Sequence, residues 1–329
     1  MSHPVCELSI GGRQVSSVFM SRLKSVSVTD NEGVSSDTID IALDDGSPQA
    51  VLPKKGDDII CNFGYKDRGT AFMGRFKVEV TDGECLPYSL RITGKAADFR
   101  SKMKEHKERH WDKTKVKDIV KEIAADHGLS ANVADAVGDH EYPWFGQNDA
   151  SDIHILENLA RRHNALFSIK NGKVIFAEKG AGKTPDGQEL TSITIKPSDV
   201  IIGTFKFSLP ARGQFKDVKA YWQDNEKIKR IEIKEPSDNK GTATYTLGEP
   251  FANEAEAKKA AASKAKDLKR GTGSISFDVE GNPSIRAGSK ILCAGIRQGI
   301  DGVDWIVKTV VHKYSKAGFI SSVTAKLKV

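Results

Sequence analysis

The sequence lacks the features that mark membrane, secreted or metal-binding proteins. No apolar run approaches the ~18 residues that a membrane-spanning helix needs, and residues 1–6 do not place a basic segment before an apolar one, as a signal peptide does. The four cysteines are scattered without metal-ligand spacing, and Cys61 and Cys293 follow paired aliphatic residues, as small buried side chains do. We therefore expect a chain made in a reducing cytosol, with no membrane span.

Catalytic and nucleotide-binding motifs are missing as well. The segment Gly180–Thr184 resembles the end of a phosphate-binding loop, but that motif requires a glycine at the position of Ala177. No G-x-S-x-G nucleophile elbow is present. His106 and His110 would share one face of a helix, yet no third metal ligand stands nearby. We therefore expect no catalytic site, no cofactor and no metal.

The charge balance is mild, with a formal net charge of +6. The densest basic stretch runs from Arg100 to Lys121 and is interrupted by acids, which is typical of a solvated helix face. A docking surface for an acidic protein and a nucleic-acid surface are the alternatives. The length of 329 residues suggests two or three domains, since domains average ~150 residues.

Short alternating segments predict β-structure at both ends of the chain. Six of them within the first 98 residues predict a small barrel or sandwich, and a closed barrel would leave no exposed strand edge. Strand patterns resume at Ile193 and continue to the C-terminus, interrupted by an Ala- and Lys-rich helix at Asn253–Arg270. The six N-terminal segments are Val5–Ile10, Leu23–Thr29, Thr38–Leu43, Asp58–Phe63, Phe72–Val80 and Tyr88–Thr93.

The middle of the chain predicts a compact α+β insert. Apolar side chains at helical spacing predict helices over Lys115–His127 and Asp152–Asn164, while residues 129–149 are expected to be irregular. Alternating segments flank Asn171-Gly172, which is a strong signal for a β-hairpin. The expected helix-terminal residues are Thr114 and Gly128 for the first helix and Ser151 for the second.

Three segments near the N-terminus recur in the same order near the C-terminus. Chance is the alternative explanation, because alternating strands are common. A true duplication would put two similar β-modules into one chain, so that fewer chains could form a ring, and this favours assembly over catalysis. The pairs are Val26–Leu43 with Val218–Ile233, Lys55–Cys61 with Ala287–Cys293, and Phe76–Val80 with Trp305–Thr309.

An aromatic cluster, Tyr142-Pro143-Trp144-Phe145, stands in a polar segment. It has two interpretations: the side chains cover the small core of the insert, or Tyr142, Trp144 and Phe145 form a protein-docking patch, since large aromatics dominate interface hot spots. Trp222 and Trp305 lie in strand patterns, where core packing is expected.

The middle of the chain also resembles a known family. Gln147–Ala160, the preceding Val116–Ala124 and the hairpin Leu166–Phe176 resemble the phage late control gene D family, the central baseplate hub of contractile tails, with relatives in phage-derived bacteriocins. The family is similar in fold to the N-terminal part of type VI secretion spike proteins. The resemblance implies two similar β-barrels flanking smaller α+β domains, and three chains in a pseudo-sixfold ring. It offers no catalytic motif to carry over.

The combined expectation is a mainly β fold with an α+β insert, in two similar small β-barrels in tandem. The expected domains are a first barrel at 1–99, an α+β domain at 100–180, a linker at 181–192 and a second barrel at 193–329 with a helix inserted at about 253–270. The function implied by the resemblance is that of a non-enzymatic homotrimeric hub between the sixfold tail tube and the threefold central spike. The implied location is the virion tail baseplate, or a phage-tail-like particle, assembled in the host cytoplasm.

The implied partners are the tube, the spike, and other baseplate and tape-measure proteins, without a membrane or a specific nucleic acid. Because the strand pattern continues to the last residue, we expect the spike to be a separate polypeptide. A single-strand nucleic-acid-binding barrel and a tail-tip cell-wall hydrolase are the rival functions. Phage, bacteriocin and other contractile injectors all remain open.

Overall fold

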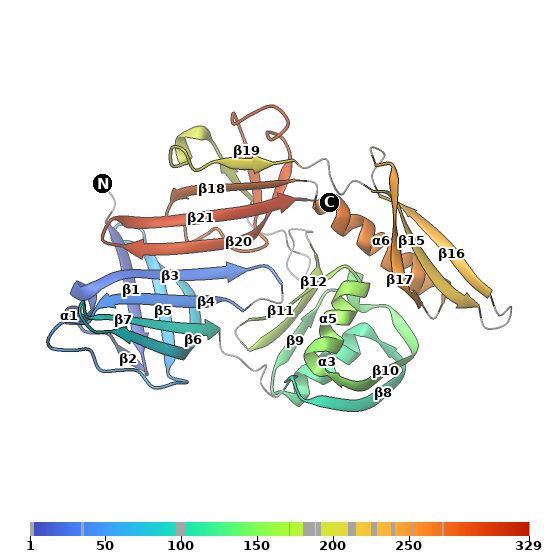
Figure 1. Ribbon diagram of the computed structural model, residues 1–329, viewed down its shortest axis with the longest axis horizontal. Coiled ribbons are helices and arrows are strands. Elements are labelled where there is room, and N and C mark those ends of the chain that lie inside the picture. Colours follow the sequence, from blue (N-terminus) through green and yellow to red (C-terminus); the bar gives the residue numbers. More distant parts are fainter. Residues whose placement is uncertain are drawn as a thin grey trace.

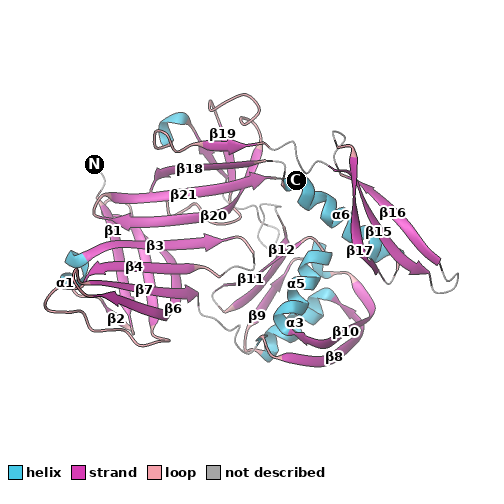
Figure 2. Ribbon diagram, viewed as in Figure 1, coloured by secondary structure: helices cyan, strands magenta, loops and turns pink. Residues whose placement is uncertain are grey.

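The computed structural model describes residues 3–33, 36–96, 103–170, 172–179, 188, 192–209, 215–224, 229–237, 241–251, 253–271 and 273–328. β-strands dominate, so the predicted mainly β class is confirmed. One sheet system of 13 strands spans both ends of the chain, an α+β part lies beside its middle, and a smaller sheet with one long helix lies at the far end (Figures 1 and 2).

The first β unit contains all six strands predicted for the N-terminal segment. Its strands follow the order β3-β4-β7-β6-β5-β1-β2, with every neighbouring pair antiparallel. Alternation produces the core: Ile39, Ile41 and Leu43 of β4 are buried, while the residues between them are half-buried. The elements are β1 (Pro4–Ile10), β2 (Arg13–Gln14), α1 (Ser17–Arg22), β3 (Leu23–Asn31), β4 (Thr38–Asp44), β5 (Asp58–Tyr65), β6 (Gly69–Glu84) and β7 (Ser89–Ala96).

The middle unit is α+β, with its own buried core. Both predicted helices are present, and the Ser151 hydroxyl caps the second by accepting from the backbone N–H of His154 at 3.3 Å. Thr114 is not a cap, because the first helix begins one residue later than expected, after Lys115. The elements are β8 (His106–Lys115), α3 (Val116–Asp126), β9 (Ser130–Val133), α4 (Asp135–Gly138), β10 (Glu141–Ser151), α5 (Asp152–Arg162), β11 (Ala165–Lys170) and β12 (Lys173–Glu178).

Two expectations for the middle unit are wrong. Residues 129–149 are not irregular, since they form β9, α4 and most of β10. The basic stretch is not a helix face throughout, because His106–Lys115 is strand β8, paired antiparallel with β10. Charged side chains occupy both faces of this strand, exposed at Glu108 and half-buried at Lys107 and Arg109, so the sequence shows no apolar alternation that would mark a strand. The expected linker at 181–192 lies almost entirely outside the described residues.

The second β unit lies next to the first. It consists of β13 (Ser192–Ile195), β14 (Lys206–Ser208), β18 (Ser274–Glu280), β19 (Lys290–Cys293), β20 (Asp304–Ser315) and β21 (Gly318–Leu327), with a short 3-10 helix at Pro197–Asp199. Its strand order is β14-β18-β21-β20-β19-β13. Its core includes Trp305, which is fully buried as predicted.

A three-stranded sheet and a helix are inserted between β14 and β18. The sheet order is β16-β15-β17, and the alanine-rich face of the helix, including Ala257, Ala261 and Ala265, packs on Val218 and Ala220. The Asn253 side chain caps the helix, which confirms the helix predicted there. The elements are β15 (Phe215–Asp224), β16 (Lys229–Pro236), β17 (Ala243–Phe251) and α6 (Glu254–Arg270).

The two β units share one strand order. The first unit has the order β1-β5-β6-β7-β4-β3, and the second has the order β13-β19-β20-β21-β18-β14. When these strands of each unit are numbered along the chain, the two orders are identical. The glycine turns also correspond: the Gly56 N–H donates to the Val78 carbonyl and the Gly288 N–H to the Val307 carbonyl, both at 2.8 Å. A bulge follows each valine. The last two predicted sequence matches therefore correspond in three dimensions.

The first predicted match is wrong. Val218–Ile233 lies in β15 and β16 of the inserted sheet, whereas strand order makes β14 and β18 the counterparts of β3 and β4. Alternating segments on either side of Asp-Asn-Glu therefore occur in strand pairs that are not counterparts. One pairing also differs between the units, because β1·β5 is antiparallel and β13·β19 is parallel. No pairing among the described strands joins β1 to β3 or β13 to β14, so edges remain.

Candidate functional site

The two β units are joined by direct strand pairing. β3 of the first unit pairs antiparallel with β20 of the second, in a register from Asn31 opposite Thr309 to Ser25 opposite Ser315. Figure 1 shows these strands side by side, although they come from opposite ends of the chain. Backbone hydrogen bonds therefore fuse the two sheets into one, and this junction fixes their relative orientation.

Side chains lock the same junction. Phe319 of β21 is 3% exposed and packs in the core of the first unit rather than its own. Its ring lies 5.3 Å from that of Phe63 and 5.8 Å from that of Tyr65, measured between centroids. The Tyr65 hydroxyl donates to the Gly281 carbonyl at 3.0 Å. Burial, and then the carboxylate of Glu280, raise the pKa of Tyr65 to about 12, so the phenol keeps this proton at neutral pH.

A charged cluster ties the middle unit to the junction. Lys170 of β11 binds Asp30 at 2.5 Å and Asp37 at 3.2 Å, and Asp30 also accepts from the backbone N–H of Ala287 at 3.1 Å. Burial raises the pKa of Asp37, and the nearby charge of Asp30 adds to the effect. Burial alone would lower the pKa of Lys170, but the two carboxylates outweigh it and the pKa is raised. Asp30 therefore connects all three parts of the chain.

A second ion pair ties the inserted helix to the first unit. The Arg270 guanidinium, at the end of α6, binds the Glu32 carboxylate at 2.9 Å, with side chains only 5% and 6% exposed. Removing one partner of such a pair leaves an uncompensated buried charge. The pair thus holds the insertion in one position.

His312 of β20 is a fully buried histidine at the junction. Its Nε2 lies 3.0 Å from the Ile285 carbonyl and its Nδ1 lies 2.8 Å from the Ser321 hydroxyl. A carbonyl only accepts, so Nε2 carries the proton and Nδ1 accepts from Ser321. Burial lowers the pKa of His312 to about 4, which keeps the ring neutral at neutral pH.

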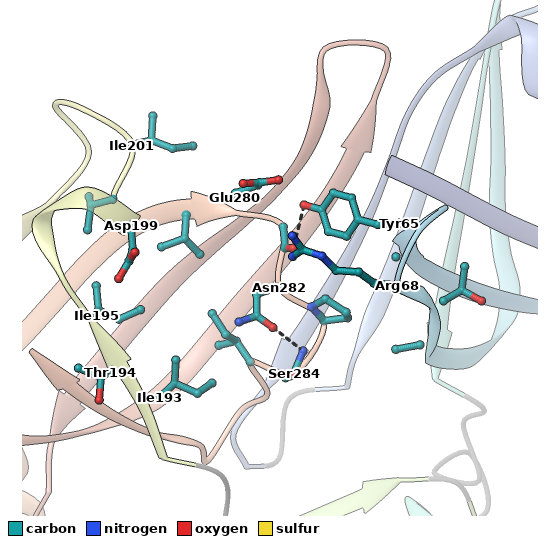
Figure 3. A pocket seen from close by; sticks show the side chains of 18 of the residues that line it. Tyr65, Arg68, Ile193, Thr194, Ile195, Asp199, Ile201, Glu280, Asn282 and Ser284 are labelled. Atoms are coloured by element: carbon teal, nitrogen blue, oxygen red, sulfur yellow. Dashed lines mark hydrogen bonds between the residues drawn. The ribbon is translucent and has the colours of Figure 1, made fainter. Parts of the chain in front are cut away.

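A groove of about 770 Å³ lies between the two β units on the side of Tyr65 and β13 (Figure 3). Two of its polar side chains, Asp199 and Asn282, are engaged in local turns. The Asp199 carboxylate accepts from the backbone N–H of Lys196 at 2.9 Å, and the Asn282 side chain accepts from the N–H of Ser284 at 3.0 Å. The groove offers a shaped, partly apolar surface rather than a set of free reactive groups.

The predicted docking patch does not form one surface. Tyr142 and Phe145 are buried, with rings 4.9 Å apart, and the Tyr142 hydroxyl lies 2.8 Å from Nε2 of His163. Only Trp144 is exposed, at 58%. For Tyr142 and Phe145 the core-covering interpretation is therefore the correct one. The sequence alone does not distinguish the core-covering interpretation from the docking interpretation, because polar residues and a bulge hide the strand pattern of β10.

The histidines considered as metal ligands are dispersed. Both form exposed pairs: His106 of β8 lies 3.1 Å from Asp149 of β10, and His110 lies 3.4 Å from Asp112 on β8 itself. No group of three or more His, Cys, Asp and Glu side chains with metal-site geometry occurs in the described part of the chain. Within the same residues, no helix has the length and apolarity to cross a membrane.

No protein-family model matches the chain. Two phage proteins match it over nearly their whole length. The "Probable baseplate hub protein" of Escherichia phage P2 is 27% identical over 362 residues, covering 98% of this chain and 92% of its own. The "Probable baseplate hub protein" of Escherichia phage 186 is 26% identical over 367 residues, covering 99% and 93%.

Solved structures share the fold. A tail protein from Neisseria meningitidis aligns with a TM-score of 0.71 at 12% identity, covering 98% of this chain and 96% of its own. The tail protein of prophage MuSo2 from Shewanella oneidensis aligns with a TM-score of 0.70 at 13% identity, covering 98% of each chain. A component of the type VI secretion system of E. coli aligns at 0.59 with 12% identity, covering 98% and 77%.

The fold is therefore that of phage tail proteins. The chain is homologous to the baseplate hub proteins of phages P2 and 186, which confirms the predicted resemblance. With it, the predicted class, a structural protein of the phage tail, and the predicted location in the virion tail baseplate are confirmed.

Proposed function

We propose that this protein is a non-enzymatic baseplate hub that forms a homotrimeric ring between the sixfold tail tube and the threefold central spike. The observation that supports this most strongly is the strand order shared by the two β units. Two similar units in each of three chains would present six similar surfaces to the tube, while the dissimilar middle units and insertions would keep threefold symmetry for the spike. The tube, the spike and neighbouring baseplate and tape-measure proteins are the partners that this role requires.

We propose four units within this role. The first β unit, 1–99, the α+β unit, 100–180, and the second β unit, 193–329, keep the boundaries expected from the sequence. Residues 215–270 form a further unit inside the second, supported by their separate sheet and core. The segment 181–192 connects the α+β unit to the second β unit.

The test is the native mass of the purified protein, alone and mixed with the tube and spike proteins of the same particle. We expect three chains per assembly in at least one of these conditions. A protein that stays monomeric and binds neither partner would refute the hub. Salt-sensitive binding of single-stranded DNA, or clearing of a peptidoglycan suspension, would instead support the nucleic-acid-binding or hydrolase alternatives.

A further inference from the structure

Among the unpaired edges of the sheet that runs through both β units, two are equivalent to strands that pair inside the chain, one edge in each unit. β6 pairs with β7 along its second half, but β5 ends its pairing at Lys77, so the opposite edge of Val80–Glu84 is free among the described strands. β14 pairs with β18 on one side, and no described strand pairs with its other side. Unpaired edges of this kind favour pairing with another chain.

The strand order shared by the two β units identifies the counterpart of each edge in the other unit. β6 corresponds to β20, and the half of β20 beyond its bulge pairs with β3. β14 corresponds to β3, because each flanks the counterpart strand, β18 or β4. Within the chain, β3 pairs with β20. The equivalent contact, between β14 and β6, is not formed among the described strands of the chain. β14 and β6 lie on opposite sides of the β3·β20 junction in the strand order and do not pair with each other within one chain. A second copy of the chain is therefore the partner that would repeat the β3·β20 contact.

We propose that β14 of one copy pairs antiparallel with the Val80–Glu84 edge of β6 in the next copy, repeating the β3·β20 contact. This inference rests on the proposed ring and names the interface that closes it. The contact is head-to-tail, with different surfaces on the two copies, and such contacts form closed rings when the rotation is right.

Pairing registers within the chain set the register between copies. Val28 lies opposite Ile39, and Phe207 lies opposite the corresponding residue of β18, Ile275. Val28 also lies opposite His312, whose counterpart in β6 is Gly83. Phe207 of one copy is thus placed opposite Gly83 of the next. The same register sets Lys206 opposite Glu84, Ser208 opposite Asp82 and Leu209 opposite Thr81.

The chemistry of the two edges fits this register. Lys206 and Glu84 have opposite charges, and opposite-charge pairs directly across two strands are stabilising. Gly83 leaves space for the ring of Phe207, an arrangement by which aromatics stabilise glycines on a strand. Phe207 and Leu209 are 43% and 54% exposed in the isolated chain. Pairing would remove that apolar surface from water.

The turn between β6 and β7 corresponds to the turn between β20 and β21, where Phe319 packs into the core of the neighbouring unit. Tyr88 is the counterpart of Phe319, which packs in the core of the first unit. In the single chain Tyr88 is 40% exposed and Leu86 is 81% exposed. Both are large apolar side chains at a turn, and the equivalence places them against the second unit of the next copy. The exposed apolar residues of the two edges therefore meet one another.

Cysteine cross-linking tests this register. In a Cys85→Ser background, which removes the exposed native thiol at the edge, Asp82→Cys and Ser208→Cys are combined in one chain. Directly opposite residues in an antiparallel pair have Cα atoms about 4.5–5.5 Å apart, which a disulfide spans. We expect covalent trimers from the double variant, covalent dimers from a mixture of the two single variants, and no cross-link from either alone.

A pair that is out of register, Glu79→Cys with Ser208→Cys, is the matched control and should not cross-link.

Charge reversal gives a second measurement: Lys206→Glu or Glu84→Lys alone should weaken self-association roughly three- to tenfold per contact, and the two together should restore it. Lys121→Glu, at an exposed lysine on α3 of the middle unit, should leave association unchanged.

The outcomes separate this interface from the ring itself. Trimers by native mass without an in-register cross-link would overturn the β14·β6 pairing and leave the hub intact. Monomers under every condition, with no cross-link, would overturn both. The cross-link together with trimers supports both.

Discussion

The rings of Phe319 and Phe63 lie 5.3 Å apart between centroids, although one residue belongs to the last hairpin of the chain and the other to β5 near its start. Phe319 is thus a residue of the second β unit that completes the core of the first. The first unit therefore depends on the C-terminal hairpin for a well-packed interior. The two units should unfold together rather than one after the other.

Replacing Phe319 by alanine should lower the free energy of unfolding by about 3–5 kcal/mol, because a buried phenylalanine is lost and a cavity remains. Urea denaturation followed by fluorescence and circular dichroism measures the change. The control is Tyr88→Ala at the corresponding exposed position, which should change the stability of the single chain by less than about 0.5 kcal/mol. Equal losses in the two variants would contradict the junction described here.

The stability of the protein should fall as the pH is lowered from about 7 to about 4, partly through His312. Burial lowers the pKa of this histidine to about 4, against a usual value near 6.5. A group whose folded pKa is depressed contributes stability above its unfolded pKa and loses it as the pH falls toward the folded pKa. The loss attributable to His312 is on the order of 3 kcal/mol.

The control for this pH dependence is His312→Gln, which retains one donor and one acceptor but does not titrate. Its melting temperature should depend less steeply on pH between 7 and 4 than that of the parent protein. Other buried histidines, such as His163 with a pKa lowered to about 3, titrate in both proteins and cancel in the comparison. Parallel pH profiles would show that His312 takes up a proton as readily in the folded state as in the unfolded state, so that folding does not lower its pKa.

Arg270→Met should destabilise the protein by about 3–5 kcal/mol, because it leaves the Glu32 carboxylate buried and unpaired. The double variant Glu32→Met with Arg270→Met should recover much of this loss. Lys266→Met is the matched control on the same helix, since its pair with Glu178 at 3.1 Å is exposed and should contribute less than about 1 kcal/mol. Chemical denaturation distinguishes these cases, and a loss of the same size in Arg270→Met and Lys266→Met would contradict a buried pair.

The duplicated glycine turns predict matched effects in the two units. Gly56 and Gly288 have φ angles of +90° and +88°, a region that costs a residue with a Cβ about 1–2 kcal/mol. Gly56→Ala and Gly288→Ala should each lower stability by this amount and add in the double variant, because the turns belong to separate cores. Gly248→Ala, at a glycine with ordinary φ and open space around its Cβ position, is the control. A strong effect in one turn only would argue against their equivalence.

The sequence predicts the strands better than their partners. Period-two alternation predicts six of the seven strands of the first unit, and only the two-residue β2 shows no pattern. Apolar side chains at 3.6-residue spacing predict α3 and α5, whereas the Ala- and Lys-rich composition predicts α6. The match of Lys55–Cys61 with Ala287–Cys293 is detectable in the sequence because both turns need a glycine with positive φ, Gly56 and Gly288. The counterpart of β3 was missed because β14 has only three residues, too few to show a period.

The candidate site was harder to predict because it is made of long-range contacts. Nothing in the sequence around Asp30, Lys170 or Phe319 shows that they meet, since each contact joins residues more than 100 positions apart in the chain or crosses between two units. The aromatic cluster illustrates the limit: Pro143 and Trp144 are exposed while Tyr142 and Phe145 are buried, an arrangement set by the geometry of β10, which a polar, bulged sequence hides. Part of the duplication is a pattern within the sequence, but the correspondence of β14 with β3, on which the proposed contact between copies depends, comes from the strand order.

The measurement that tests the account most directly is the native mass of the assembled protein, with and without its tube and spike partners. The account predicts a species of three times the 35.9 kDa chain mass, in which the Asp82→Cys and Ser208→Cys chain closes into a covalent ring. A monomer of 35.9 kDa in every mixture would contradict it.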